Sequence, residues 1–329
     1  MASVRVALRN LRPGAVFLIL TSVVINFSGS SRQSDHPTEE HSTFMSIRVI
    51  CDSSQNVPES LLSGLNLIEV PASVIFGDEV YLNKVELSDE EFYRRLGDLP
   101  KGASLPTTTQ PTPGQFTKAI EQAKAEGATG ILITSVSSHL SGTHNSAVQA
   151  AAQENDVPVV VWDTLSASVG GGWQTISAAE MVQAGASLEE VTAALPDIQK
   201  RVNTFFTVDT LKFLVAGGRL SPIQGMMGAL LNVKPMLVIE DGLLKPLGRE
   251  RGRKTAKNAL IDLTRQRVGD KPVRVALAHA NVLDEAEAFV PAVRAGLNVQ
   301  ELIVVELGPV LAALAGPGLM ALGTLAVAE

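Results

Sequence analysis

Residues Gly130–Trp162 read GILITSVSSHLSGTHNSAVQAAAQENDVPVVVW, and they decide the fold class. The two ends of this stretch, Gly130–Val136 and Val157–Trp162, are short runs rich in β-branched residues, which are typical of buried strands. Between them, Ser141–Glu154 is predicted to form a helix. A strand, a helix and a second strand in this order indicate two parallel strands joined by a crossover helix.

The same alternation of strand and helix extends to both sides of this unit. Ser88, with Glu91 three residues later, has the spacing of a helix N-cap, and Pro113 is typical of a first helical turn. The pattern predicts an N-terminal α/β domain, residues 46–203, with helices on both faces of a parallel sheet. We expect its other elements to be strands at Ile47–Cys51 and Leu67–Val74 and helices at Ser88–Leu96, Pro113 to about Ala125, Gly170–Ala184 and Leu188–Val202.

The pattern changes after about Asn203. Asp241-Gly242 separates two apolar runs, Val233–Ile239 and Leu243–Leu247, which is the signature of a β-hairpin. We therefore predict a two-domain α/β fold whose second domain, residues 204–329, has a mixed or antiparallel sheet. Its other expected elements are helices at Asp209–Ala216, Ile223–Leu231, Lys254–Gln266 and Leu283–Ala295, and strands at Val273–Ala278, Val299–Glu306 and Leu319–Ala328.

Residues 1–45 form an extension before this pattern begins. Arginines precede a short apolar run, Ala15–Phe27, and a Ser-rich polar stretch follows it. This order is typical of a secretory signal, and the apolar run is too short for a stable membrane span. The alternative is that Met45 is the true start, because a strand begins almost directly after it. We favour a spurious or dispensable extension, since no A-x-A cleavage site is evident, and we expect a cytoplasmic protein.

Composition and charge argue against several kinds of function. Among 329 residues there are 27 Lys and Arg against 34 Asp and Glu, which gives a formal net charge of −7. Such a chain has no overall attraction for phosphate backbones, so nucleic acid is not an expected partner. The single cysteine, Cys51, cannot form an internal disulfide, and no Cys/His cluster has the spacing of a zinc site. We expect neither a metal nor a cofactor.

Two hydroxyl-rich loops are the candidate binding elements. Leu105–Thr112 (LPTTTQPT) carries adjacent threonines between two prolines, and Ser135–His144 (SVSSHLSGTH) joins a predicted strand to a helix. Ligands of open α/β sheets bind where the strands end, and free N–H groups at a helix start attract a phosphate or carboxylate. Each hydroxyl alone is better explained as a helix cap or a turn residue. Two such loops in one domain favour a shared polar pocket.

Other motifs give weaker alternatives. The glycines of Asp163–Gly172 follow a strand, but their spacing is not that of a dinucleotide-binding G-x-G-x-x-G loop. A hydrolase or transferase that uses Ser141 with His139 or His144 on a small ester or phosphate is a second hypothesis. A regulatory module that binds another small anion is a third.

Taken together, these stretches resemble the DegV family, the fatty-acid-binding subunits of bacterial fatty acid kinase. The resemblance runs in order from about residue 46 to 329, and its combination of segments is specific, although each segment alone is not. The segments are VICDS at Val49–Ser53, TTTQPT at Thr107–Thr112, SSHLSGTHNSA at Ser137–Ala147, DTLSASVGGG at Asp163–Gly172, LKFLVAGGRLS at Leu211–Ser221, LNVKPML at Leu231–Leu237, DGLLKPLGRERGRKTA at Asp241–Ala256, and Gly316-Pro317-Gly318.

The resemblance implies a lipid carrier that is not itself an enzyme. It would bind one long-chain fatty acid in a tunnel between its domains, and a separate kinase would phosphorylate the carboxylate to an acyl phosphate for phospholipid metabolism. Arg219 and Arg251 match the segments that dock the kinase, whereas a basic run such as Arg249–Lys254 is otherwise ordinary solvated surface. The implied carboxylate ligands, with Thr108 and Ser141 foremost, are Thr107, Thr108, Thr109, Ser138, Ser141, Gly142 and Thr143.

Two positions depart from the family pattern. Thr109 stands where the family usually has serine, and it keeps the hydroxyl. Leu314 stands where the family commonly has a histidine of the carboxylate network, two residues before Gly-Pro-Gly. We therefore include His279, which follows a predicted strand, as a candidate replacement. For the acyl tail, the expected apolar wall is Ala167, Val169, Met226, Met227, Leu230 and Leu231.

Overall fold

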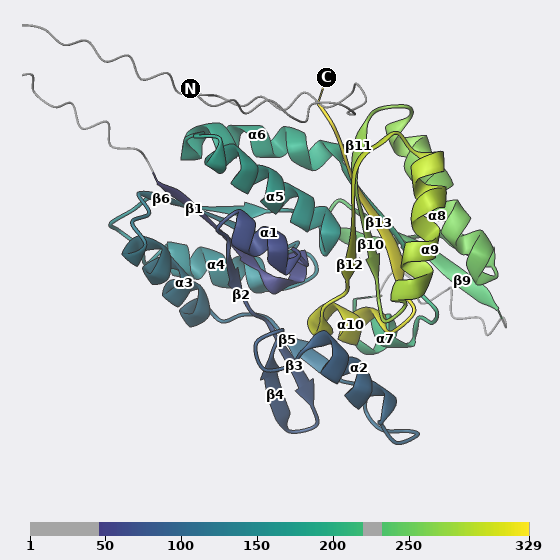
Figure 1. Ribbon diagram of the computed structural model, residues 1–329. Coiled ribbons are helices and arrows are strands. Elements are labelled where there is room, and N and C mark those ends of the chain that lie inside the picture. Colours follow the sequence, from purple (N-terminus) through teal and green to yellow (C-terminus); the bar gives the residue numbers. More distant parts are fainter. Residues whose placement is uncertain (1–45, 220–231, 329) are drawn as a thin grey trace, which may run out of the picture. The chain divides into compact units, whose positions relative to one another are not determined.

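The computed structural model describes residues 46–219 and 232–328, which contain three β-sheets and the helices that cover them (Figure 1). It confirms a two-domain α/β fold with a parallel sheet in the N-terminal part and a mixed sheet in the C-terminal part. The chain passes from the first sheet to the second at Val202, where helix α6 ends and strand β8 begins. The division into residues 46–203 and 204–329 stays a prediction.

The first sheet has four parallel strands in the order β2-β1-β6-β7. One face is covered by α3 and α4, whose apolar side chains pack against Ile50, Ile131 and Ile133. The other face is covered by α5 and α6, which pack against Val49 and Leu132. The elements are β1 (Ile47–Asp52), η1 (Ser53–Gln55), α1 (Glu59–Gly64), β2 (Ile68–Val70), α3 (Pro113–Ala125), β6 (Gly130–Ser135), α4 (Thr143–Ala151), β7 (Val159–Asp163), α5 (Val169–Gln183) and α6 (Leu188–Arg201).

The second sheet has six strands in the order β10-β9-β8-β13-β11-β12, and only β11 and β12 run parallel to each other. The predicted hairpin is confirmed as β9 and β10, whereas β8 and α10 were not predicted. The outer face packs against α8 and α9, and the inner face shares a core with α5. The elements are β8 (Val202–Thr207), α7 (Lys212–Ala216), β9 (Val233–Glu240), β10 (Leu243–Arg251), α8 (Arg253–Val268), β11 (Val273–His279), α9 (Leu283–Gly296), β12 (Val299–Glu306), α10 (Pro309–Ala315) and β13 (Met320–Ala326).

A third, small antiparallel sheet corrects the prediction of one strand at Leu67–Val74. The chain instead forms β2, breaks at Pro71 and continues as β3 (Ser73–Phe76), which pairs with β4 (Glu79–Leu82) and β5 (Thr107–Thr109). Proline lacks an N–H donor and cannot continue a ladder. Ala72 then donates its N–H to Oγ of Ser53 at 3.1 Å instead of to a strand. The break leaves β3 outside the first sheet. Because β5 pairs with β3, its threonines also lie outside the first sheet.

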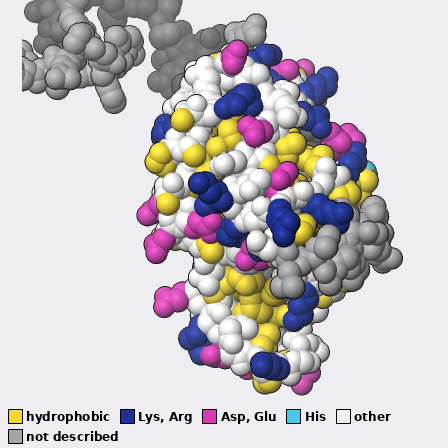
Figure 2. Space-filling view, turned by 90° about the vertical axis from the view of Figure 1, so that its right-hand side faces the viewer, with side chains coloured by type: hydrophobic (Ala, Val, Ile, Leu, Met, Phe, Trp, Pro, Cys, Tyr) yellow, Lys and Arg dark blue, Asp and Glu magenta, His cyan; other side chains and the backbone are white. Residues whose placement is uncertain are grey.

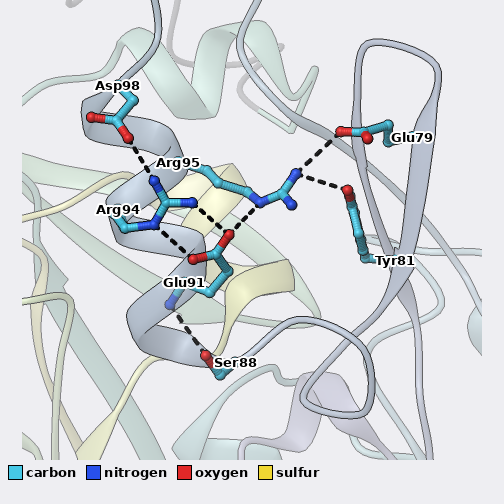
Figure 3. Close-up of polar contacts among 7 residues, drawn as sticks. All are labelled: Glu79, Tyr81, Ser88, Glu91, Arg94, Arg95 and Asp98. Atoms are coloured by element: carbon cyan, nitrogen blue, oxygen red, sulfur yellow. Dashed lines mark hydrogen bonds and ion pairs between the residues drawn. The ribbon is translucent and has the colours of Figure 1, made fainter.

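Helix α2 (Asp89–Gly97) is joined to the small sheet by a polar network (Figure 3). Oγ of Ser88 accepts from the N–H of Glu91 at 3.2 Å, which confirms the predicted cap. The Arg95 guanidinium bonds the Glu91 carboxylate at 2.7 Å and also reaches Tyr81 at 2.7 Å and Glu79 at 3.1 Å. Hydrogen bonds from Arg94 and Arg95 lower the pKa of Glu91 to about 2. The network is exposed, so it orients the helix more than it stabilises the fold.

The N-terminal extension, residues 1–45, and the predicted helix Ile223–Leu231 lie outside the described residues. Within the ranges that are described, no helix combines the length and hydrophobicity that crossing a bilayer requires.

Candidate functional site

A pocket lies between the inner face of the second sheet and the ends of the first-sheet strands, and its empty space, counted together with the part open to solvent, is about 900 Å³. Most of its surface is apolar, and a group of hydroxyls and one arginine interrupts it. Its lining residues are Ser54, Ala72, Thr108, Thr109, Gln110, Val136, Leu140, Ser141, Thr143, Ala167, Ser168, Thr204, Phe206, Leu214, Arg219, Ile239, Leu244, Leu307, Val310, Leu311, Leu314, Ala315, Leu319 and Ala321.

The apolar wall comes mainly from the C-terminal domain. Alternate residues of a strand face the same side, so the inner face of the second sheet presents Phe206, Ile239 and Ala321 to the pocket. Helix α10 adds four further apolar residues, among them Leu314. The wall therefore has the chemistry of a site for a hydrocarbon, rather than for a sugar or a nucleotide.

The predicted tail wall is only partly found there. Ala167 lines the pocket, but Val169 does not, because its side chain packs against the backbone of Gly323. The other four predicted positions, Met226, Met227, Leu230 and Leu231, lie outside the described residues.

Four of the hydroxyl-bearing residues that line the pocket come from β5 and from the start of α4, and we call them the hydroxyl cluster: Thr108, Thr109, Ser141 and Thr143. The first two come from β5, where Thr108 is half-buried opposite Val74 of β3 and Thr109 is exposed. The other two flank Gly142, the N-cap residue of α4, and Oγ of Ser141 lies 2.9 Å from Oγ1 of Thr143. Helix α4 adds its N-terminal partial positive charge. The arrangement suits an anionic oxygen group.

Three other predicted ligands lie beside the pocket but do not line it. Thr107 is exposed and is absent from the pocket lining. Ser138 is exposed, and its N–H faces the carboxylate of Asp163 at 3.3 Å. Gly142 is the N-cap residue of α4, and in the sequence it stands between Ser141 and Thr143.

The structure does not bring His279 into the pocket, contrary to the expectation that it replaces the missing histidine. It ends β11 and is buried, with Nδ1 3.0 Å from Oε2 of Glu306. Burial raises the pKa of Glu306, but hydrogen bonds from His279, Asn281 and Tyr93 outweigh it, and the net pKa is lowered. His279 therefore serves as a partner for the half-buried carboxylate of Glu306. At the position of the family histidine, Leu314 faces the pocket.

The two arginines expected to dock a partner differ in their surroundings. Arg219 lines the pocket, and its guanidinium donates to the carbonyl oxygens of Gly217 at 2.6 Å and Leu140 at 3.3 Å. Carbonyls satisfy its donors without neutralising its charge. Arg251 is exposed at the end of β10 and forms no ion pair with the described residues. The position of Arg219 gives the pocket a positive charge close to the loop of the hydroxyl cluster.

The serine–histidine hypothesis finds no support in this geometry. Ser141 pairs with Thr143 rather than with an imidazole. Nδ1 of His144 instead lies 2.8 Å from Oγ of Ser135, a fully buried residue that does not line the pocket. Nδ1 of His139 lies 3.1 Å from the carbonyl oxygen of Asp241. No Ser–His pair therefore lies at the pocket within the described part of the chain.

The three glycines Gly170–Gly172 have a packing role. A side chain on Gly170 would overlap the hydroxyls of Thr204 and Ser166, and one on Gly171 would overlap the amide of Gln55. These close approaches let α5 pack tightly against η1 and β8. Among the described residues there is also no group of three His, Cys, Asp or Glu side chains arranged to hold a metal.

Two residues that shape the site, Asp52 and Thr204, were not among the predicted site residues. Asp52 is fully buried, and its carboxylate accepts from the N–H groups of Val136 at 2.7 Å and Ser54 at 2.8 Å. Burial raises the pKa of Asp52. Asp52 thus fixes the first residue of the loop that leads to Ser141. Its position directly after a buried strand was the available signal. Thr204 lines the pocket from β8, a strand that was not predicted, so no signal in the sequence marked it.

Comparison with known proteins agrees with this architecture. The family model of DegV, described as an uncharacterised protein family, matches residues 46–327. The chain belongs to the DegV family. A DegV domain-containing protein of Deinococcus radiodurans is 36% identical over 275 residues, which cover 83% of this chain and 96% of that protein. A protein of Thermotoga maritima named fatty acid-binding protein is 33% identical over 288 residues, covering 85% of this chain and 97% of its own.

Solved DegV structures have the same fold. A fatty-acid-binding DegV family protein from Thermus thermophilus matches with a TM-score of 0.78 at 34% identity, covering 86% of this chain and 100% of that one. DegV of Bacillus subtilis, described as a fatty acid binding protein, matches with a TM-score of 0.76 at 28% identity, again over 86% of this chain and 100% of its own. The likeness therefore includes both domains.

Proposed function

We propose that this DegV protein binds one long-chain fatty acid, with its tail along the apolar wall and its carboxylate at the hydroxyl cluster. The observation that carries the proposal is the pocket itself, which joins an extended apolar wall to four hydroxyls, a helix N-terminus and Arg219. Relatives described as fatty acid-binding support it. Of the predicted carboxylate ligands we retain Thr108, Thr109, Ser141 and Thr143, and Arg219 joins them.

The acyl tail and the carboxylate of the fatty acid contribute different amounts to the binding free energy. Burying about fourteen methylenes contributes on the order of 11 kcal/mol at roughly 0.8 kcal/mol each, and the entropic cost of association offsets several kcal/mol of that. A charge-assisted hydrogen bond contributes roughly 1.5–3 kcal/mol. The tail therefore dominates affinity, while the hydroxyl cluster sets the direction in which the acid enters.

The proposal includes a carrier role without catalysis by this chain. In this role the carboxylate lies at the hydroxyl cluster, and a separate kinase reaches it there and forms an acyl phosphate. The exposed Arg251 and its basic neighbours, together with Arg219, are the docking surface that we propose for such a cytoplasmic partner. No cofactor is required for this role.

Native mass spectrometry followed by lipid extraction tests the binding proposal. The protein, expressed from Met45, should carry one mass increment that matches a C16–C18 fatty acid, and lipid-free protein should take up added palmitate in a one-to-one ratio. Protein that purifies empty and also refuses added fatty acid would overturn the proposal. Incubation with a fatty acid kinase and ATP, with acyl phosphate as the readout, tests the presentation role separately.

A further inference from the structure

Gln110 directly follows β5 and lines the pocket next to the hydroxyl cluster. The residue is exposed, yet its side chain is held in place by two contacts. Nε2 lies 3.4 Å from Oγ of Ser146, one turn into α4. The carboxamide also lies against Gly142, because a Cβ built on that glycine would be 2.5 Å from Oε1 and 2.6 Å from Nε2.

The contact with Gly142 explains why this position has no side chain. Its backbone angles, φ −74° and ψ 4°, are accessible to any residue, so glycine is not needed for conformation. The absence of a side chain instead leaves room for the Gln110 amide, which any larger residue would displace. The amide is thus packed against the peptide that links Ser141 to Thr143, the two α4 members of the hydroxyl cluster.

The chemistry of this amide fits an ionised carboxylate. A primary amide has two N–H donors, and the long contact with Ser146 uses at most one of them. The amide is uncharged, and it lies beside Ser141 and Thr143. It can therefore add a hydrogen-bond donor to this part of the pocket, in addition to the charge of Arg219. We propose that Gln110 is a specificity residue, which donates to the ionised headgroup of the fatty acid and so selects acids over neutral lipids of equal chain length. This inference rests on the fatty-acid function proposed above.

The test compares an acid with the alcohol of the same length. Dissociation constants for dodecanoate and dodecanol are measured at pH 8 and low ionic strength on the full-length wild type, on Q110E and on Q110L. The Q149E variant is the charge-matched control, because Gln149 is exposed on the far part of α4 and does not line the pocket. Both ligands share the tail, so any effect on packing cancels in the ratio of their affinities.

We expect Q110E to weaken dodecanoate binding about tenfold through like-charge repulsion that added salt reduces, and to change dodecanol binding less than twofold. Q110L should lower the acid-to-alcohol preference in the same direction by a smaller factor, and Q149E should leave it unchanged. Equal losses for both ligands in Q110E, or no loss for either, would overturn the assignment and leave Gln110 with only its packing role against Gly142. Failure of the wild type to bind dodecanoate at all would instead overturn the proposed function.

Discussion

Replacing Ala321 with leucine tests whether the pocket holds an acyl tail. Ala321 lies in the middle of the second sheet, is 4% exposed and faces the pocket. Leucine adds three carbon atoms to the wall, which should exclude about three methylenes of the ligand. At roughly 0.8 kcal/mol for each methylene, the loss is about 2.4 kcal/mol, which corresponds to about fiftyfold weaker binding of palmitate. Isothermal titration calorimetry on lipid-free protein measures this directly.

The cross-strand neighbour of Ala321 provides a matched control. Ala278 of β11 is paired with Ala321 and is fully buried, but it does not line the pocket. Leucine at Ala278 overfills a packed core and should lower the free energy of unfolding by about 1–3 kcal/mol. Leucine at Ala321 enters open space and should not lower it, as urea denaturation of the lipid-free protein will report. The reasoning is refuted if A321L is as destabilised as A278L and still binds palmitate with wild-type affinity.

Three further predictions concern the headgroup and the buried charges. The double variant T108A/S141A should weaken palmitate binding about tenfold, because one or two charge-assisted hydrogen bonds to the carboxylate are lost. Binding of hexadecanol, which has no carboxylate, should change less. Equal affinity of wild type and variant for palmitate in a displacement assay would contradict the carboxylate assignment. R219A should make palmitate binding less sensitive to salt between 20 mM and 500 mM, since the proposed counter-charge is removed; an unchanged salt dependence would place the arginine outside the binding interaction. Burial raises the pKa of Glu69 from 4.5 to about 7, so the ionised form opposes folding increasingly as the pH rises from 4.5 to 7. E69Q should therefore raise the free energy of unfolding by up to about 3 kcal/mol above pH 7 and by almost nothing at pH 4. If urea titrations show the same gain in the free energy of unfolding at both pH values, another effect of the substitution is responsible.

The sequence predicted best those elements whose own residues specify them. The cap of α2 at Ser88, the start of α3 at Pro113 and the hairpin at Asp241-Gly242 all depend on local chemistry, and all three are found. Strand β8 was missed because it follows α6 without a break, so no turn residue marks its start. Helix α10 was missed because its seven residues are too few to show a helical period.

The candidate site follows the same distinction. The hydroxyls of β5 and α4 belong to two loops that are recognisable in the sequence. Four of the ligands predicted in these loops line the pocket. His279 was proposed from its place after a strand, but alternation along β11 turns its side chain to the face that packs against Glu306 of the neighbouring β12. Which face a residue occupies depends on register with the next strand, and one chain segment does not specify that.

Strand β13 lies between β8 and β11, yet it is the last of the described strands to be synthesised. While the ribosome is still making residues up to about 326, β8 and β11 have no partner between them, and each presents an open edge on which other chains could assemble. The same late segment supplies Leu319 and Ala321 to the pocket wall. A nascent chain therefore lacks part of the pocket wall until β13 has been made, and under the proposed function the acyl tail has no complete wall to bind before that point.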